Sequence, residues 1–298
     1  MIQGSCLCGA IVWAASGPFE GMAHCHCSMC RKAHGATFGT AVGVPLATFR
    51  FERGAEQVVR YDSPVRTARA FCVRCGSTVP AVPREGERIF LPAGCFDDDP
   101  GVRPIAHIFT ASKAPWAEIN DALPRFDAYP PGLMGSRRSA SPCYAGTGFG
   151  DQREGSSRAS GAIRGTCLCE RVAFEAAPPF GPMTSCHCSR CRKMVAAAHA
   201  TDFRVKAAGF RWLRGREHVR DFVLPGAKWF MTSFCDACGS VLPHVARNDA
   251  NFVLIQAGAL DDDPGIRPVL HLFVASKAAW EEITDALPQF DEYPPSRA

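Results

Sequence analysis

The chain has 298 residues, of which 47% are hydrophobic and 21% charged, with a formal net charge of +4. This is the composition of an ordinary globular protein, and its length predicts one or two domains. The basic residues form no run of five or more, which argues against a nucleic-acid surface, and no stretch approaches the roughly 18 apolar residues of a membrane span. The start, MIQGSCLCGAIVW, lacks the pattern of a signal peptide. We therefore expect a cytoplasmic protein whose 16 cysteines stay reduced and bind metal.

The first half of the chain is a series of short strands followed by one helix. Five runs with β-branched and aromatic residues, bounded by Gly or Pro, predict strands at Ala10–Ala14, Phe49–Tyr61, Arg69–Cys72, Ile89–Pro92 and His107–Thr110. Trp116, Ile119 and Leu123 then follow at helical spacing. Pro115 suits the first turn of such a helix and Pro124 its end. The prediction is a mostly β domain of antiparallel sheets, stapled by metal, with a short C-terminal helix.

The second half of the chain repeats the first. GSCLCGAIVW (4–13) reappears as GTCLCERVAF (165–174), and the later motifs follow in the same order. Between the copies, residues 132–162 are rich in Gly, Ser and Arg without apolar periodicity, which predicts a flexible linker. The sequence therefore predicts two tandem domains of one topology, residues 2–131 and 163–297.

Seven cysteines in each copy follow the order CxC…CxCxxC…CxxC, and four of them suit a structural metal site. In Cys6-Leu-Cys8 the two sulfurs share one face if the segment is extended. Cys72-x-x-Cys75, followed by Gly76, has the turn shape of a zinc knuckle. Four thiolates favour a closed, tetrahedral zinc site that contributes to folding. The corresponding residues of the second copy are Cys167, Cys169, Cys235 and Cys238.

The other three cysteines of each copy lie on one short CxCxxC segment. They are Cys25, Cys27 and Cys30 in the first copy and Cys186, Cys188 and Cys191 in the second. Three protein ligands leave the fourth tetrahedral position vacant, which is the pattern of a reactive zinc site. His26 and His187 fall between cysteines and would face away from the metal, in a supporting or surface role. Two alternatives stay open: one binuclear cluster of all seven thiols, or an iron–sulfur cluster on CxCxxC and a fourth cysteine.

Some conspicuous residues have simpler interpretations. Asp97-Asp98-Asp99-Pro100-Gly101 could look like an acidic metal loop, but the Pro and Gly predict a turn. His107 and His271 sit in strand-like segments and suit structural histidines. Cys95 and Cys143 have no counterpart in the other copy.

The motifs GSCLCGAIVW, HCHCSMCRKAHGATFGT, FCVRCGS and LPAGCFDDDPGVRPIAHIF resemble the glutathione-dependent formaldehyde-activating (GFA) family, also called centromere protein V-like. The resemblance covers residues 2–131 and about 163–297. It implies a β-tent fold with a structural zinc on the first CxC and last CxxC. It also implies a catalytic zinc on CxCxxC, hence two zinc ions per copy and four per chain. The implied activity is that of a carbon–sulfur lyase, which makes or breaks the bond between a thiol, typically glutathione, and formaldehyde or a related aldehyde.

The residues that follow CxCxxC suggest how a substrate would be held. Arg31 and Lys32 could pair with carboxylates of a tripeptide thiol, although a solvated surface turn is the simpler interpretation. The next segment is AHGATFGT (33–40) in the first copy and MVAAAHAT (194–201) in the second. Our hypothesis is that both copies bind zinc and that the first is the more active on the usual substrate.

The expected partners are a small thiol and an aldehyde, without nucleic acid or membrane, and the two domains could pack on each other. The alternative function is a non-catalytic zinc module that binds or carries glutathione adducts or a protein partner.

Overall fold

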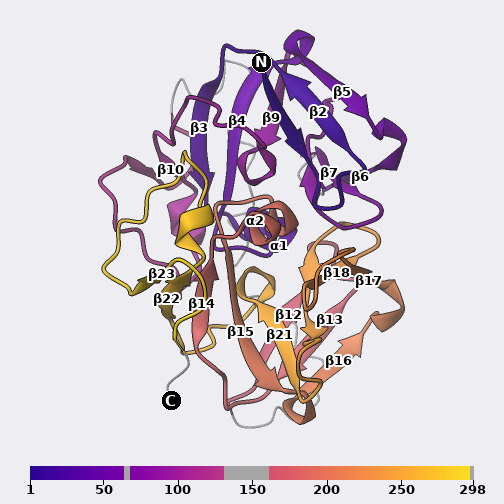
Figure 1. Ribbon diagram of the computed structural model, residues 1–298, viewed down its shortest axis with the longest axis vertical. Helices are drawn as coiled ribbons and strands as arrows, with labels where there is room; N and C mark the ends of the chain where they lie inside the picture. The colour runs from indigo at the N-terminus through magenta and orange to yellow at the C-terminus, as the bar shows by residue number, and fades with distance from the viewer. Residues whose placement is uncertain (64–67, 131–160, 296–298) are drawn as a thin grey trace.

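Both copies fold into β-sheets, and Figure 1 shows them above and below a centre that holds the two helices. The computed structural model describes residues 1–63, 68–130 and 161–295. The predicted linker at 132–162 therefore lies almost entirely outside the described residues, and so does Cys143. Among the described residues, no helix has the length and apolar character needed to cross a membrane.

Three sheets make up the first copy, and each predicted run contains a strand, although the run Phe49–Tyr61 holds two strands of different sheets that are separated by a 3₁₀ turn at Ala55–Gln57. In β9, Ile89 and Leu91 are buried while Arg88 and Phe90 are exposed, as expected when alternate side chains face the core. Neighbouring strands are antiparallel, except that β10 runs parallel to β3 and β11. In spatial order the sheets are β1 (Ile2–Ser5), β2 (Val12–Ala15), β5 (Phe49–Arg53); β11 (Arg125–Phe126), β10 (His107–Ile108), β3 (Glu20–Cys25), β4 (Gly39–Pro45), β9 (Arg88–Pro92); and β6 (Val58–Asp62), β7 (Ala68–Cys72), β8 (Thr78–Val79).

The second copy repeats this topology with one further strand, β20, in its largest sheet. Its sheets are β12 (Ile163–Thr166), β13 (Ala173–Ala176), β16 (Phe210–Arg214); β20 (His244–Val245), β21 (Phe252–Gln256), β15 (Ala200–Lys206), β14 (Met183–Cys186), β22 (Pro268–Leu272), β23 (Gln289–Phe290); and β17 (Val219–Val223), β18 (Met231–Cys235), β19 (Val241–Leu242). Short 3₁₀ turns punctuate both copies at Leu46–Thr48, Ala55–Gln57, Ala93–Cys95, Thr110–Ser112, Ala207–Gly209, Arg216–His218, Ala257–Ala259 and Val274–Ser276. The predicted fold class, mostly β with antiparallel sheets in a duplicated arrangement, is confirmed.

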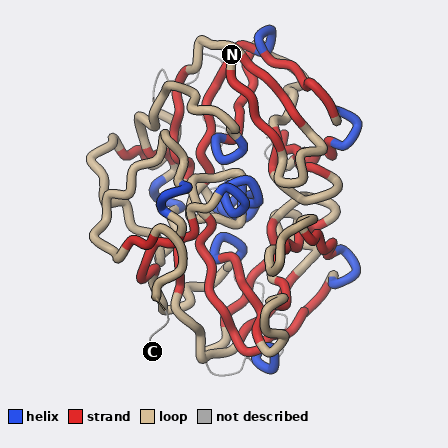
Figure 2. Tube along the Cα trace, viewed as in Figure 1, coloured by secondary structure: helices blue, strands red, loops and turns tan. Residues whose placement is uncertain are grey.

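The predicted C-terminal helices are wrong. The α-helices of the described chain are α1 (Ser28–His34) and α2 (Ser189–Val195), which begin within the CxCxxC segments. They form the blue coil at the centre of the molecule in Figure 2. The segment from Trp116 to Leu123 is irregular, because the Asp121 carboxylate accepts a hydrogen bond from the Leu123 amide and so competes with helical bonding.

The tryptophan of that segment is buried, but against the other copy. Trp116 packs with Phe174 and Phe203 of the second copy, and Trp280 packs with Trp13 and Val42 of the first. Burying such large side chains supplies much of the stability of a core. The two copies therefore share their cores, and neither completes its own.

Candidate metal centres

Four thiols converge in each copy, and we call these groups the four-thiol clusters. In the first copy Cys8 Sγ lies 3.5 Å from Cys6 Sγ and 3.8 Å from Cys72 Sγ, and Cys75 completes the group. These separations are far longer than the ~2.05 Å of a disulfide. A tetrahedral zinc with Zn–S near ~2.3 Å places its sulfurs about 3.8 Å apart, so the spacing fits such an ion. The second copy groups its sulfurs in the same way, from Cys167, Cys169, Cys235 and Cys238.

The surroundings of the first four-thiol cluster favour negative charge on some of its sulfurs and disfavour it on others. The Ile11 amide donates a hydrogen bond to Cys6 Sγ at 3.3 Å. Hydrogen bonds with Cys72 and Cys75 lower the pKa of Cys6 to about 7, whereas hydrogen bonds and burial raise the pKa of Cys75 above its usual range. Four thiols this close cannot all ionise without a cation, and a divalent metal supplies one.

Three thiols converge at the end of β3 and the first turn of α1, and we call this group and its counterpart the three-thiol clusters. In the first copy they are Cys25, Cys27 and Cys30, with all sulfurs within 4.8 Å of one another. Cys27 caps α1, and its sulfur accepts the Cys30 amide at 3.3 Å. The second copy repeats this arrangement with Cys186, Cys188 and Cys191. Among the described residues, no fourth Cys, His, Asp or Glu joins either group, so a tetrahedral ion would have an open position.

An apolar wall from both copies surrounds the first three-thiol cluster. Cys27 is buried with Ile108 and Phe109, and Leu168 of the second copy packs against the same group. Leu168 lies between Cys167 and Cys169 of the second copy's four-thiol cluster. The three-thiol cluster of the first copy therefore lies close to the four-thiol cluster of the second. A dry wall of this kind strengthens the electrostatic effect of any ion held there.

The lysine expected to contact substrate is engaged between the copies. Lys32 Nζ lies 2.5 Å from Asp261 Oδ1 and donates to the Thr166 carbonyl at 2.9 Å. Its counterpart Lys193 pairs with Asp97 in the same way. The predicted aspartate turn is therefore an anchor for the other copy's helix.

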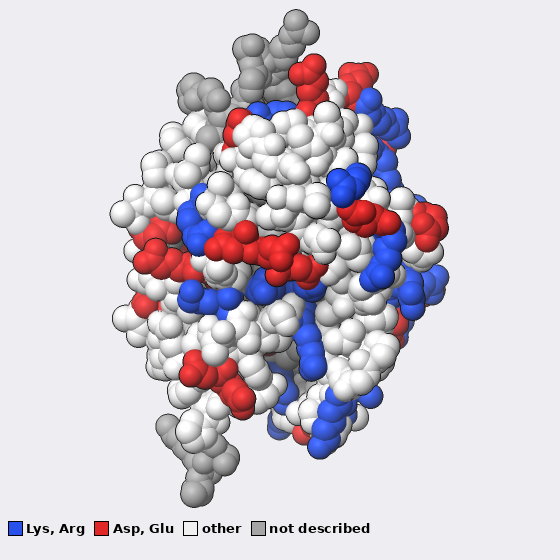
Figure 3. Space-filling view, turned by 45° about the horizontal axis from the view of Figure 1, so that its top comes forward, with Lys and Arg blue, Asp and Glu red and all other residues white. Residues whose placement is uncertain are grey.

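On the face shown in Figure 3, acidic and basic side chains lie beside one another instead of forming a patch of one sign.

Arg31 is buried and does not share the ion pair of the neighbouring Lys32. Only 4% of it is exposed, and its Nε and Nη1 atoms have no hydrogen-bond partner within the described chain. Burial lowers the pKa of Arg31, and the nearby Cys27 and Asp261 oppose that effect. A buried guanidinium with free donors keeps the capacity to bind an anion.

The segments that differ after the cysteines lie both beside the three-thiol clusters and at the interface between the copies: a Cβ at Gly39 would lie 3.5 Å from Cys30 Cβ, and Cys191 packs against the cluster that holds Met194 and Val195. Phe38 contacts His24 and His199, with ring centroids 4.5 Å and 5.7 Å away. Met194 and Val195 pack against the four-thiol cluster of the first copy. These differences therefore lie partly at the interface between the copies, and the hypothesis that they make the first copy the more active stays a prediction.

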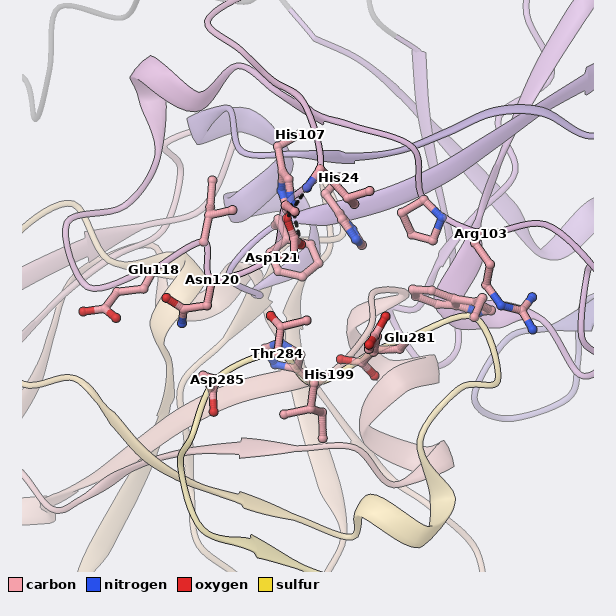
Figure 4. A pocket seen from close by; sticks show the side chains of 18 of the residues that line it. His24, Arg103, His107, Glu118, Asn120, Asp121, His199, Glu281, Thr284 and Asp285 are labelled. Carbon is pink, nitrogen blue, oxygen red and sulfur yellow. Dashed lines mark hydrogen bonds and ion pairs between the residues drawn. The ribbon is translucent and has the colours of Figure 1, made fainter.

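The histidines beside the cysteines point to the opposite side of the strand, into a cavity of about 680 Å³ between the copies. Figure 4 shows His24, His107 and Asp121 on one wall and His199, Thr284 and Asp285 on the other. His26 Nε2 lies 2.8 Å from His107 Nδ1, and His107 Nε2 lies 2.8 Å from Asp121. Burial, with the neighbouring His107, lowers the pKa of His26 to about 3. His26 and His187 are buried, so the surface alternative is wrong, and their supporting role stays a prediction.

The second copy extends this histidine chain by one carboxylate. His187 bonds to His271 at 2.8 Å, His271 bonds to Asp285, and Glu281 bonds to His187 Nδ1 at 3.0 Å. Burial alone would raise the pKa of Glu281, but the hydrogen bond from His187 brings it below its usual value. The first copy has Ala117 at the position of Glu281, and the buried Nδ1 of its own histidine, His26, finds no hydrogen-bond partner among the described residues.

One residue beside the first three-thiol cluster was missed by sequence reasoning. Arg69 Nη2 donates to Cys30 Sγ at 3.6 Å. Burial would lower the pKa of Arg69, but the thiols of Cys30 and Cys27 outweigh it and raise that pKa. The available signal was the contrast between ARAFC (68–72) and MTSFC (231–235) in otherwise matching strands.

The family described as "Glutathione-dependent formaldehyde-activating enzyme" (GFA) matches residues 1–112 and 162–276. This chain belongs to that family. A GFA relative from Halomonas elongata, named "Putative glutathione-dependent formaldehyde-activating enzyme", is 30% identical over 128 residues, which is 40% of this chain and 81% of that protein. A crystal structure of a Rhodobacter sphaeroides protein is 30% identical and covers 35% of this chain and 92% of its own, with a TM-score of 0.29. Both matches span about the length of one copy.

Proposed function

We propose that the chain is a zinc-dependent carbon–sulfur lyase that makes or breaks adducts of glutathione with formaldehyde or a related small aldehyde. The observation that carries this proposal is the three-thiol cluster with no fourth ligand among the described residues, in a member of the GFA family. In this proposal the four-thiol clusters hold structural zinc and the three-thiol clusters hold reactive zinc. The chain then binds four zinc ions and works in a reducing compartment, the cytoplasm.

The proposed chemistry needs a thiolate that is protected from water. Bound zinc supplies a Lewis acid that ionises a coordinated thiol. Cys25, Cys27 and Cys30 would hold the ion, and the hydrogen bond from the Cys30 amide helps to orient the Cys27 sulfur. The apolar side chains of Phe109 and Leu168, which pack beside these cysteines, would limit the access of water to the sulfur. The thiol sulfur then attacks the aldehyde carbon, a C–S bond forms, and the thiol proton ends on the former carbonyl oxygen. The reverse step releases the thiol and the aldehyde.

Two features support particular roles within this reaction. Arg31, buried with unused donors, is proposed to bind a carboxylate of the tripeptide thiol. Lys32 has a lesser claim, because its ammonium already pairs with Asp261. We propose that both copies bind zinc and that the first is the more active.

The test is exchange spectroscopy of glutathione and formaldehyde, with and without the zinc-loaded full chain, because the two combine spontaneously. We expect faster exchange with the wild-type chain and only the spontaneous rate with a Cys27→Ser, Cys188→Ser double variant. Tight binding of the adduct without faster exchange would instead support a carrier, and the lyase proposal would fail.

A further inference from the structure

The two three-thiol clusters differ in the charge beside them. In the first copy, Arg69 on β7 donates to Cys30 Sγ at 3.6 Å, and its buried Nε atom has no hydrogen-bond partner within the described chain. In the second copy the same strand position holds Thr232, which is 1% exposed. Within the described residues, no arginine or lysine donates to a sulfur of Cys186, Cys188 or Cys191.

A second substitution does not offset this contrast. Asp202 on β15 takes the place of Ala41; burial, with Cys188, raises its pKa to about 7, and the nearby Arg204 opposes that shift. The first cluster therefore has a cation that donates to one of its sulfurs, whereas the matching position of the second cluster is neutral. Neither pair lies in the segments that follow CxCxxC.

The charge balance at such a cluster makes this difference important. Three thiolates and a divalent ion sum to one negative charge, and a fourth thiolate brings the sum to two. A guanidinium that donates to one sulfur withdraws negative charge from it, which makes a further thiolate easier to accept. Because the cluster is partly buried, this electrostatic effect is only weakly screened by water.

We infer that Arg69 is a positioning residue that acts through Cys30 and makes the first three-thiol cluster the tighter site for a thiol. Thr232 leaves the second cluster the weaker site. This inference rests on the proposed function, since it takes the thiol to be the fourth ligand. The inference assigns the difference in thiol affinity between the copies to residues 69 and 232, and not to the segments 33–40 and 194–201.

The experiment is a titration of the cobalt-substituted full chain with glutathione, followed by the absorption of cobalt–thiolate bonds. The wild-type chain should show a tight and a weak binding event. Arg69→Thr should weaken the tight event about tenfold, the size expected for losing a hydrogen bond to a charged group. Thr232→Arg should tighten the weak event, and Arg69→Lys should retain part of the effect.

Two controls separate this role from simpler ones. Arg60→Thr changes an exposed arginine that bonds to Asp62, and it should leave both events unchanged. The uncharged thiol 2-mercaptoethanol should show the same dependence on residue 69 as glutathione does. A dependence seen with glutathione alone would mean that Arg69 binds a substrate carboxylate, which would overturn the inference.

The remaining outcomes distinguish the inference from the proposed function. If glutathione leaves the cobalt spectrum of the wild-type chain unchanged, the proposed function fails. If glutathione binds but neither Arg69→Thr nor Thr232→Arg changes its affinity, only the inference fails. Should Arg69→Thr fold poorly, the Thr232→Arg variant decides: an unchanged weak event would overturn the inference.

Discussion

Phe71 of the first copy and Phe234 of the second meet with ring centroids 6.2 Å apart, each directly before a CxxC knuckle. The glycine that follows each knuckle leaves room for the opposing ring. A Cβ at Gly239 would lie 2.4 Å from Phe71 Cγ, and one at Gly76 would lie 2.4 Å from Phe234 Cγ. Each four-thiol cluster is therefore built against the other copy.

Gly239→Ala should destabilise the chain more than Gly226→Ala does. Both glycines have φ near +75°, which costs an L-residue roughly 1–2 kcal/mol, but Gly226 has no atom within 4 Å of its added Cβ. The clash with Phe71 should add about 2 kcal/mol for Gly239→Ala. Denaturant unfolding of the zinc-loaded chain measures both. If both variants lose the same free energy of unfolding, the contact between the two CxxC knuckles is too loose to oppose the added methyl group.

A chain cut between its copies should stay together. The cores are shared, since Trp116 packs in the second copy and Trp280 in the first. With a protease site introduced between residues 132 and 162, the cleaved chain should elute as one species in size-exclusion chromatography and separate only in denaturant. Halves that separate without denaturant would contradict the shared core.

The local parts of this structure could be predicted from the sequence, and among the long-range parts only the meeting of each CxC with its CxxC could. Strand patterning and cysteine spacing depend on neighbouring residues, so β9 and the convergence of Cys25, Cys27 and Cys30 followed from them. The helix predicted from the spacing of Trp116, Ile119 and Leu123 is wrong, because the same spacing also fits an irregular segment whose tryptophan is buried by the other copy. The domain limits at 2–131 and 163–297 stay a prediction.

The site residues show the same contrast between local and long-range sequence signals. The pairing of Lys32 with Asp261 joins residues far apart in sequence, and no local signal identifies such a partner. Arg69 reaches Cys30 through the fold of β7, so only a comparison of the two copies could have singled it out. Sequence spacing gives the ligands of a metal site more readily than the groups that tune it.

Glu281→Ala should destabilise the second copy, because the Glu281 carboxylate is buried and bonds to His187. Loss of a hydrogen bond to a buried charged group costs roughly 1–3 kcal/mol. Glu282→Ala, at the exposed next position, should change the free energy of unfolding by less than about 0.5 kcal/mol. If Glu281→Ala unfolds like Glu282→Ala, the hydrogen bond contributes nothing to stability.

Asp202→Asn should stabilise the chain at alkaline pH. Burial raises the pKa of Asp202 from 3.8 to about 7, so the folded chain holds this proton more tightly than the unfolded chain does. Stability is therefore lost progressively as the pH rises from about 4 to 7, and an asparagine escapes that loss.

The gain from Asp202→Asn should be small at pH 5 and reach about 1–2 kcal/mol at pH 8, allowing for partial solvent screening. Asp291→Asn, at an exposed position, is the control and should show no such trend. A gain at pH 5 as large as at pH 8 would show that Asp202 ionises normally in the folded chain.

The most direct test of the account is the metal content of the full chain by native mass spectrometry with elemental analysis. We predict four zinc ions per wild-type chain, three in Cys27→Ser and three in Cys188→Ser, with both variants still folded. Two zinc ions per wild-type chain, or iron together with inorganic sulfide, would contradict the division of each seven cysteines into four and three.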